Sequence, residues 1–306
     1  MPNLQTCGGA AAAQACAPAA HASAQPVLHQ PNSRRTAGRK LTLALFILAA
    51  VALVVIVVCG ANIGPKATIA DFSAKNIAPC WEHLFGTDRM GRDMLTRTLA
   101  GLATSVLVGL LAASVSSLIA LALGTLAALG GKRADAVVTW LIDLMMGIPH
   151  IVLLILISYA LGKGFWGVTI GVAVTHWPSL TRVVRAEVLQ CRESGFVAVA
   201  GKLGVSKVAI AVRHMLPFVL PQFLVGLILL FPHAILHEAA VTFLGFGLSP
   251  EQAAIGNILS ESMSYLTAGM WWLAVFPGLA LIGTVALFDV AGSNLRKLLD
   301  PHSAQE

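Results

Sequence analysis

The stretch that decides the fold is residues 99–129, which read LAGLATSVLVGLLAASVSSLIALALGTLAAL and contain no charged side chain. A helix needs about 20 consecutive apolar residues to cross the hydrocarbon core of a bilayer. This run is longer than that, and Lys132 and Arg133 follow it closely. Basic residues at the end of an apolar run are typical of a membrane-spanning helix. Residues 99–129 therefore predict a transmembrane helix.

The composition of the whole chain also indicates a membrane protein. Hydrophobic residues make up 57% of the 306 residues and charged residues only 11%, with a mean hydropathy of +0.81. Soluble domains usually carry about 25% charged residues. The net charge of +6 does not indicate a nucleic-acid partner, because the basic residues lie at the ends of apolar runs. Membrane lipid is instead the expected surrounding of this chain.

Five further apolar segments have the length of a membrane span. They are residues 41–60, 136–161, 166–184, 216–244 and 271–292. Together with 99–129 they predict an all-α integral membrane protein with six transmembrane helices. The third span contains Gly147-Ile148-Pro149, which should kink or break the helix because proline removes a backbone donor and clashes with the preceding turn.

The segments between these spans give the rest of the organisation. Residues 1–40 are polar and have no apolar period, which predicts a disordered tail. Residues 41–98 hold the first helix and a polar connection, residues 99–295 a core of five helices, and residues 296–306 a short second tail. Most of the 20 Lys and Arg residues lie in the tails or on the same side as the tails. The positive-inside rule therefore predicts that both termini are cytoplasmic and the 61–98 connection extracytoplasmic.

Motifs of catalysis are absent from the sequence. It contains no GxxxxGK[ST], HExxH or GxSxG pattern and no paired-carboxylate site. We therefore expect a non-enzymatic chain without a cofactor of its own, and if ATP drives transport, the motor is another polypeptide.

A basic connection, residues 185–214, is the most informative segment. Apolar residues follow helical spacing on both sides of Gly204, which predicts two short helices broken by a glycine turn at the cytoplasmic surface. Such an element can dock into a groove on a partner. The alternative is an ordinary amphipathic loop that lies at the membrane interface.

This connection resembles the EAA loop of permeases from binding-protein-dependent ABC importers. Gly204 and Leu216-Pro217 match that pattern in place, whereas Ala198, followed by Val199 and Ala200, stands where the family has its glutamate. The resemblance implies that this loop contacts the ATPase. The residues expected to couple to it are Ala198, Val199, Ala200, Gly204, Val205, Ser206 and Lys207.

Three more motifs, in the same order as in the family, strengthen the resemblance. Residues 85–93, FGTDRMGRD, are similar to a signature of the second permease subunit of dipeptide, oligopeptide and nickel importers. Residues 242–247, TFLGFG, resemble a second family motif, and Asn294-Leu295-Arg296 with Leu299-Asp300-Pro301 a third. The four motifs together cover about residues 41–301.

The resemblance implies a type I ABC importer permease fold and a set of partners. A second permease subunit would pair with this chain to form the pathway, and two ATPase subunits carrying ATP and Mg would lie beneath it. An extracytoplasmic solute-binding protein would deliver the solute. The expected location is a bacterial inner membrane.

Histidines suggest what is carried. His233 and His237 are one helical turn apart in the fifth span, so their imidazoles can share a face. Glu238 follows directly, His176 ends the fourth span, and His150 follows the break in the third. Ionisable groups inside a membrane are costly, and imidazole is a good ligand for Ni²⁺. We therefore expect His176, His233, His237 and Glu238 along the pathway, with His237 as the candidate metal contact.

Several functions remain open from the sequence. The first is import of nickel or a metal chelate, which the histidines favour, and the alternative is di- or oligopeptide import by the same machine. An ion-coupled secondary transporter is a third hypothesis, and would need charged residues clustered at the bilayer midplane. A membrane enzyme is a fourth, but no catalytic set is present. An ATPase that co-purifies would exclude the last two.

Overall fold

The computed structural model describes residues 33–299. The predicted tail up to residue 32, and residues 300–306 with the Asp300-Pro301 part of the last motif, lie outside these described residues. Within them the chain is helical, and Thr87 and Asp93 form an isolated bridge that is part of no strand. The prediction of an all-α chain is confirmed.

Ten α-helices account for most of the described chain. They are α1 (Ser33–Ile63), α2 (Met94–Leu129), α3 (Gly131–Gly147), α4 (His150–Ala160), α5 (Gly164–Arg192), α6 (Gly195–Lys202), α7 (Lys207–Ile210), α8 (Leu216–Phe243), α9 (Ile255–Leu266) and α10 (Trp272–Leu299). Two short 3₁₀ turns, η1 (Gly64–Thr68) and η2 (Phe72–Ala74), follow α1, and a π-helical turn, η3 (Ala211–Met215), leads into α8.

Four segments of the described chain are long and apolar enough to cross a membrane. They lie in α1, α2, η3 with α8, and α10, and the bent pair of α3 and α4 adds a fifth if it counts as one span. The remaining predicted span corresponds to α5, which is 29 residues long but contains polar and basic side chains such as Ser179 and Arg182. The predicted number of six spans therefore stays a prediction.

The third predicted span is broken where the sequence places Gly147-Ile148-Pro149. The axes of α3 and α4 differ by 93° across this break. Ile148 has an extended backbone, with φ −95° and ψ 136°, because the ring of the following proline disfavours the helical conformation at this position. The predicted kink is thus confirmed, and His150 is the first residue of α4 after it.

Close packing of the helices depends on small residues. A Cβ atom at Gly60 of α1 would collide with the Leu99 carbonyl of α2, and one at Gly124 of α2 would collide with Val184 of α5. Because lipid offers little hydrophobic drive for helix association, such close backbone approach is a main source of packing energy in membranes. The helix α2 is the central helix of the bundle, and it contacts α1, α5 and α8.

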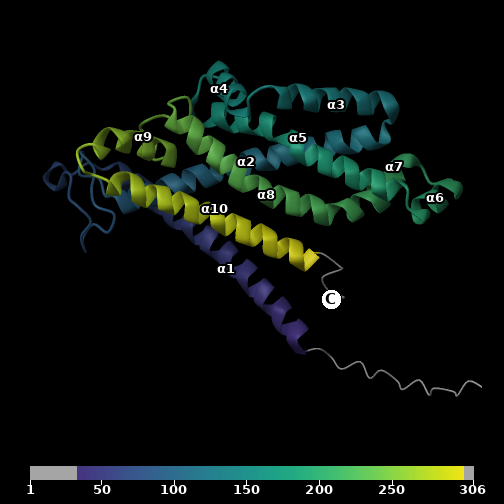
Figure 1. Cartoon of the computed structure of the whole chain (residues 1–306), viewed down its shortest axis with the longest axis horizontal. Coiled ribbons are helices and arrows are strands. Elements are labelled where there is room, and N and C mark those ends of the chain that lie inside the picture. The colour runs from purple at the N-terminus through teal and green to yellow at the C-terminus, as the bar shows by residue number, and fades with distance from the viewer. Residues whose placement is uncertain (1–32, 300–306) are drawn as a thin grey trace, which may run out of the picture.

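The two ends of the bundle differ in structure (Figure 1). One end holds the 64–93 connection and α9, and is called here the connection end. The other holds α6 and α7 and is called the loop end; α1 starts and α10 ends toward the same side, below and apart from α6 and α7 in this view. The segment between α8 and α10 contains the amphipathic helix α9, with Ile255 and Ile258 buried.

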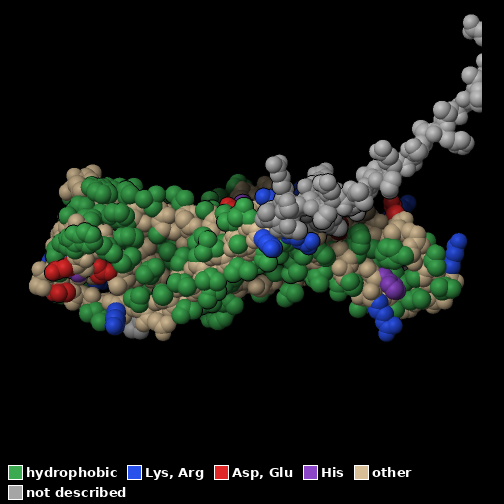
Figure 2. All heavy atoms as spheres, turned by 90° about the horizontal axis from the view of Figure 1, so that it is seen from below, with side chains coloured by type: hydrophobic (Ala, Val, Ile, Leu, Met, Phe, Trp, Pro, Cys, Tyr) green, Lys and Arg blue, Asp and Glu red, His purple; other side chains and the backbone are tan. Residues whose placement is uncertain are grey.

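Apolar side chains cover much of the length of the face seen in Figure 2, and acidic side chains gather near the connection end. Large apolar residues exposed on α1 include Leu48, Val51 and Val54. A long apolar surface on a single chain is expected where lipid or another membrane subunit covers it.

Candidate functional site

A cavity lies between the α3–α4 break, α5 and α8. Its volume is about 780 Å³. The lining is mainly apolar, with polar side chains from three separate helices. The lining includes Pro149, His150, His176, Ser179, His233 and His237. A mainly apolar cavity with a few convergent polar groups is the usual form of a small-molecule site.

Three histidines meet at the wall of this cavity. His150 begins α4, His176 lies in α5 and His237 in α8. Their ring centroids are 4.5–4.9 Å apart and the rings are roughly perpendicular. One ring nitrogen from each residue lies within 4.8 Å of those of the other two. This set, the histidine cluster, is therefore compact enough to act on one small ligand.

Hydrogen bonds orient two of the rings. The Nδ1 of His176 lies 2.9 Å from the Val172 carbonyl oxygen, and the Nδ1 of His237 lies 2.7 Å from the His233 carbonyl oxygen. A carbonyl can only accept, so each Nδ1 carries the hydrogen and each neutral ring keeps its lone pair on Nε2. The Nε2 of His176 is 3.2 Å from the Nδ1 of His237. Among the described residues, the buried Nε2 of His150 has no hydrogen-bond partner.

The other residues expected along the pathway have different surroundings. His233 lines the same cavity and supplies the carbonyl that orients His237. Glu238 lies elsewhere: it is fully buried, its Oε1 accepts a 2.8 Å hydrogen bond from Thr242, and it is not among the residues lining the cavity. The structure thus groups His176, His233 and His237 and separates Glu238 from them.

His150 was noted in the sequence only as the residue after the break, and was not placed among the pathway residues. Its proximity to His176 and His237 depends on the 93° break and on the packing of α4 against both α5 and α8. No periodicity within one helix carries that information. The available signal was the coincidence of a histidine with an expected break in the helix.

The motif at residues 242–247 forms the turn that closes α8. Gly245 has φ +82°, a conformation that favours glycine. The turn is tied to α4 and α5: the Ser158 hydroxyl donates to the Phe246 carbonyl at 2.8 Å, and the Gly164 N–H donates to the Gly247 carbonyl at 2.9 Å. This motif therefore fixes the helices that carry the histidine cluster.

At the loop end, the predicted pair of short helices is present as α6 and α7. Gly204 separates them with φ +79°, and the Val205 N–H donates to the Ala200 carbonyl at 3.2 Å, as in a glycine-capped helix end. Ser206 accepts a bond from the Ala209 N–H at 3.2 Å and so caps α7. Lys207 is the first residue of α7. The helix α5 continues to Arg192, so the first residues of the predicted basic connection are helical.

Apolar side chains of this loop point outward. Phe196, Val199 and Leu203 are exposed, the last by 78%, and Ala198 is exposed between them. Such side chains at the tip of an otherwise packed bundle indicate a surface that a partner covers.

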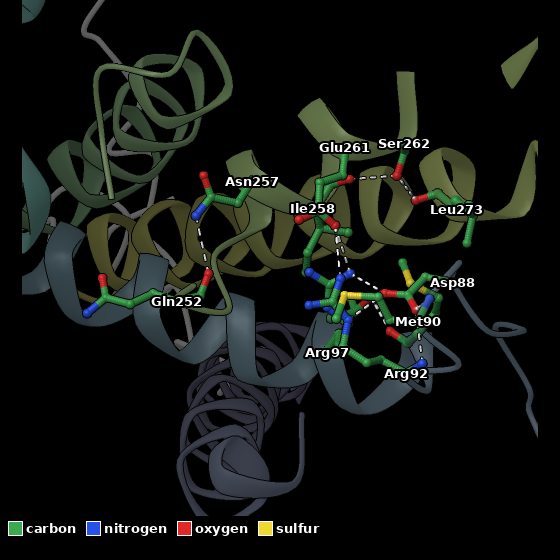
Figure 3. A network of polar contacts seen from close by, with 12 residues as sticks. Asp88, Met90, Arg92, Arg97, Gln252, Asn257, Ile258, Glu261, Ser262 and Leu273 are labelled. Carbon is green, nitrogen blue, oxygen red and sulfur yellow. Dashed lines mark hydrogen bonds and ion pairs between the residues drawn. The ribbon is translucent and has the colours of Figure 1, made fainter. Parts of the chain in front are cut away.

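The motif at residues 85–93 builds an ion-pair cluster at the connection end (Figure 3). Asp88 accepts hydrogen bonds of 2.7 Å from both Arg92 and Arg97. Glu261 of α9 accepts from the same two arginines at 3.2 and 3.1 Å. The Asp88 and Arg97 side chains are only 7% and 4% exposed. This cluster, called here the ion-pair cluster, joins the connection, α2 and α9.

Further ion pairs link α3 to α5. Arg185 binds both carboxylate oxygens of Asp135, at 2.6 and 2.8 Å, and Arg182 binds Asp143 at 3.1 Å. The second pair is mostly exposed. Asp143 therefore pairs with a neighbouring helix and is not among the residues lining the cavity.

The helices, the cavity between three of them and the exposed loop define a multi-span membrane protein of the kind that carries solutes. Residues 120–305 match the family described as the inner membrane component of binding-protein-dependent transport systems. The chain belongs to this family, and it is a permease subunit of an ABC importer. It is accordingly a multi-pass protein of the inner membrane.

Relatives resemble this chain over most of its length. A putative peptide permease protein of Brucella suis is 36% identical over 234 residues, which are 76% of this chain and 78% of the relative. The dipeptide transport system permease protein DppC of Bacillus subtilis is 32% identical over 270 residues, 88% of this chain and 84% of its own length.

A solved structure supports the fold independently. The inward-facing MetNI methionine ABC transporter contains a chain that aligns with a TM-score of 0.57 at 18% identity, covering 68% of this chain and 98% of that one. At this level of identity the likeness concerns the fold alone. It confirms the predicted type I importer permease fold.

Proposed function

We propose that this chain forms half of the pathway through which an ATP-driven importer carries short peptides. The observation that carries the proposal is the similarity, over most of the chain, to relatives named peptide or dipeptide permeases. The cavity of about 780 Å³ beside α5 and α8 has the size of a small-molecule site. These relatives favour the peptide hypothesis over nickel import as the main function.

A second permease subunit completes the pathway, and its partner surface is the exposed apolar face of the bundle. Two ATPase subunits bind α6 and α7 at the loop end, where Phe196, Val199 and Leu203 supply the apolar contact. ATP hydrolysis takes place on those subunits. The loop end, with the start of α1 and the end of α10, is then cytoplasmic, and a solute-binding protein docks at the connection end.

The glycine turn is what makes α6 and α7 a stiff docking element. A residue with a side chain at φ +79° is strained by about 1–2 kcal/mol, so Gly204→Val would distort the turn while leaving the spans intact. We expect this variant to assemble poorly with the ATPase subunits and to lose transport. Gly131→Val is the matched control, since this glycine also has a positive φ, +84°, in open space.

The function is tested with the chain, its second permease, its ATPases and its binding protein reconstituted in nanodiscs. Peptide import predicts that dipeptides delivered by the binding protein stimulate ATP hydrolysis, and that vesicles with the same assembly accumulate labelled dipeptide. Stimulation by Ni²⁺ or its chelates alone would replace the peptide proposal with the second candidate, nickel import, which the histidine cluster favours. No stimulation by either class would refute both.

A further inference from the structure

We propose that His150, His176 and His237 form a binding site for one divalent transition-metal ion, of the class that prefers imidazole, such as Co²⁺, Ni²⁺, Cu²⁺ or Zn²⁺. The binding of the ion stands on the geometry alone. Its role, recognition of a metal bound to a chelating peptide during passage, rests on the proposed function.

The first support is the close approach of three imidazole rings from three helices, each of which can offer a nitrogen lone pair to a metal ion. Their ring nitrogens lie within 4.8 Å of one another. Ligands around a tetrahedral ion with bonds of about 2.1 Å are about 3.4 Å apart. The rings therefore need to move inward by little more than 1 Å, which side-chain rotation in a cavity permits.

The second support is the hydrogen bonding behind the rings. Histidines that bind metals almost always donate their other ring N–H to a carbonyl or carboxylate, which fixes the ring and its tautomer. His176 does so to the Val172 carbonyl, and His237 to the carbonyl of His233. Both rings are therefore held with their lone pair on Nε2, and the one on His176 lies 3.2 Å from the Nδ1 of His237, a contact that a bound ion would replace.

The third support is the unpartnered nitrogen of His150. Its Nε2 is buried, and the described residues offer it no hydrogen bond. A buried polar atom without a hydrogen bond destabilises the fold by about 1–3 kcal/mol. A ligand that binds this nitrogen would remove that cost. A metal ion would accept this lone pair together with the other two.

The composition of the site selects the ligand. Among the described residues no carboxylate lines the cavity: Glu238 is turned toward Thr242, and Asp143 is paired with Arg182. A set of nitrogen donors disfavours Mg²⁺ and Ca²⁺, which require oxygen ligands. Three protein ligands also leave a coordination position open toward the cavity, as in sites that bind a further ligand. A peptide that chelates the ion from that side fits this arrangement.

The test uses the complete importer in nanodiscs, with any polyhistidine tag removed, titrated with CoCl₂. Tetrahedral Co²⁺ with nitrogen ligands absorbs visible light, so the spectrum reports the site directly. We expect the wild type to bind one more Co²⁺ per copy of this chain than His237→Ala does. His150→Ala and His176→Ala should each weaken Co²⁺ binding by at least about tenfold, as loss of even an orienting partner does.

Two variants separate ligation from folding. His83→Gln removes a histidine of the connection end that does not line the cavity, and should leave Co²⁺ affinity unchanged. His237→Cys replaces one ligand by another, and should keep the ion while adding a sulfur-to-cobalt band in the near ultraviolet. Assembly of every variant is checked by size exclusion, and a fall in affinity of His237→Cys to the level of His237→Ala would count against direct ligation.

The outcome also separates this proposal from the proposed function. An importer that responds to dipeptides, but binds no more Co²⁺ than His237→Ala, overturns the metal site and leaves peptide import standing. An importer that binds the extra Co²⁺ but does not respond to peptides supports the site and contradicts peptide import.

Discussion

The ion-pair cluster and the histidine cluster are both polar groups set among apolar helices, but they are satisfied in opposite ways. At the connection end, Asp88 and Glu261 each contact both Arg92 and Arg97, so every charge has an opposite partner. In the cavity, His150 keeps a nitrogen without a partner among the described residues. The comparison teaches that closed polar networks hold segments together, whereas incomplete ones beside a cavity are positioned to receive a ligand.

The largest effect is expected from breaking the closed network. Asp88→Ala leaves the nearly buried Arg97 without its shortest ion pair. Removing one partner of a buried pair costs about 3–5 kcal/mol, because the remaining charge is left uncompensated. We expect a clear fall in the temperature at which the importer unfolds in detergent. An unchanged temperature would show that Glu261 alone can satisfy both arginines.

A smaller effect is expected at the rim of the same cluster. The Glu261 side chain is 34% exposed, and its loss leaves the bonds from Asp88 to both arginines in place. Glu261→Gln should therefore cost about 1 kcal/mol or less. Thermal unfolding in low and high salt tests this, since the difference from wild type should shrink at high salt. A loss as large as that of Asp88→Ala would mean that the two carboxylates act as one unit.

The histidine cluster is expected to behave in the reverse way. His150→Leu removes a buried nitrogen that has no partner. The free energy of unfolding should therefore stay the same or rise by up to about 1 kcal/mol, and the unfolding temperature with it. Co²⁺ binding should be lost at the same time. If His150→Leu instead destabilised the protein, the ring would have a structural role, and the histidine cluster would stabilise the fold as the ion-pair cluster does.

The smallest effect is expected at Asp71, an exposed acid of the connection. The Ser73 hydroxyl and N–H donate to it at 2.6 and 3.0 Å and lower the pKa of this carboxyl. Because the folded state lowers the pKa, any stabilisation is present at neutral pH and is lost as the pH falls through the folded-state pKa. Asp71→Asn should differ slightly from wild type at pH 7 and not at all in acid. A difference that grows in acid would contradict this assignment.

The sequence predicted the features that depend on neighbouring residues. Apolar runs indicated the long helices α1, α2, α8 and α10, because a span requires only length and composition. Pro149 predicted the break, and Gly204 the turn between two short helices, because each imposes its backbone geometry locally. The same reasoning could not find α9, whose short amphipathic pattern lies among turn residues.

Contacts between segments that are far apart in the sequence could not be predicted from it. The FGTDRMGRD motif was recognised, but its bond to Glu261 joins residues that are 169 positions apart in the sequence. His176 and His237 were selected separately, and only packing of α4, α5 and α8 brings them to His150. The amphipathic pattern of a helix gives no register against its neighbours, so which polar side chains meet is settled by tertiary structure.

The break between α3 and α4 has a mechanical consequence. Bending an intact helix disrupts its backbone hydrogen bonds, but at Ile148 and Pro149 the helical ladder is already interrupted. A change of angle at this joint therefore costs little additional bonding. It would reshape the wall of the cavity that Met145, Met146 and Pro149 form, while the 242–247 turn keeps α4 tied to α5 and α8.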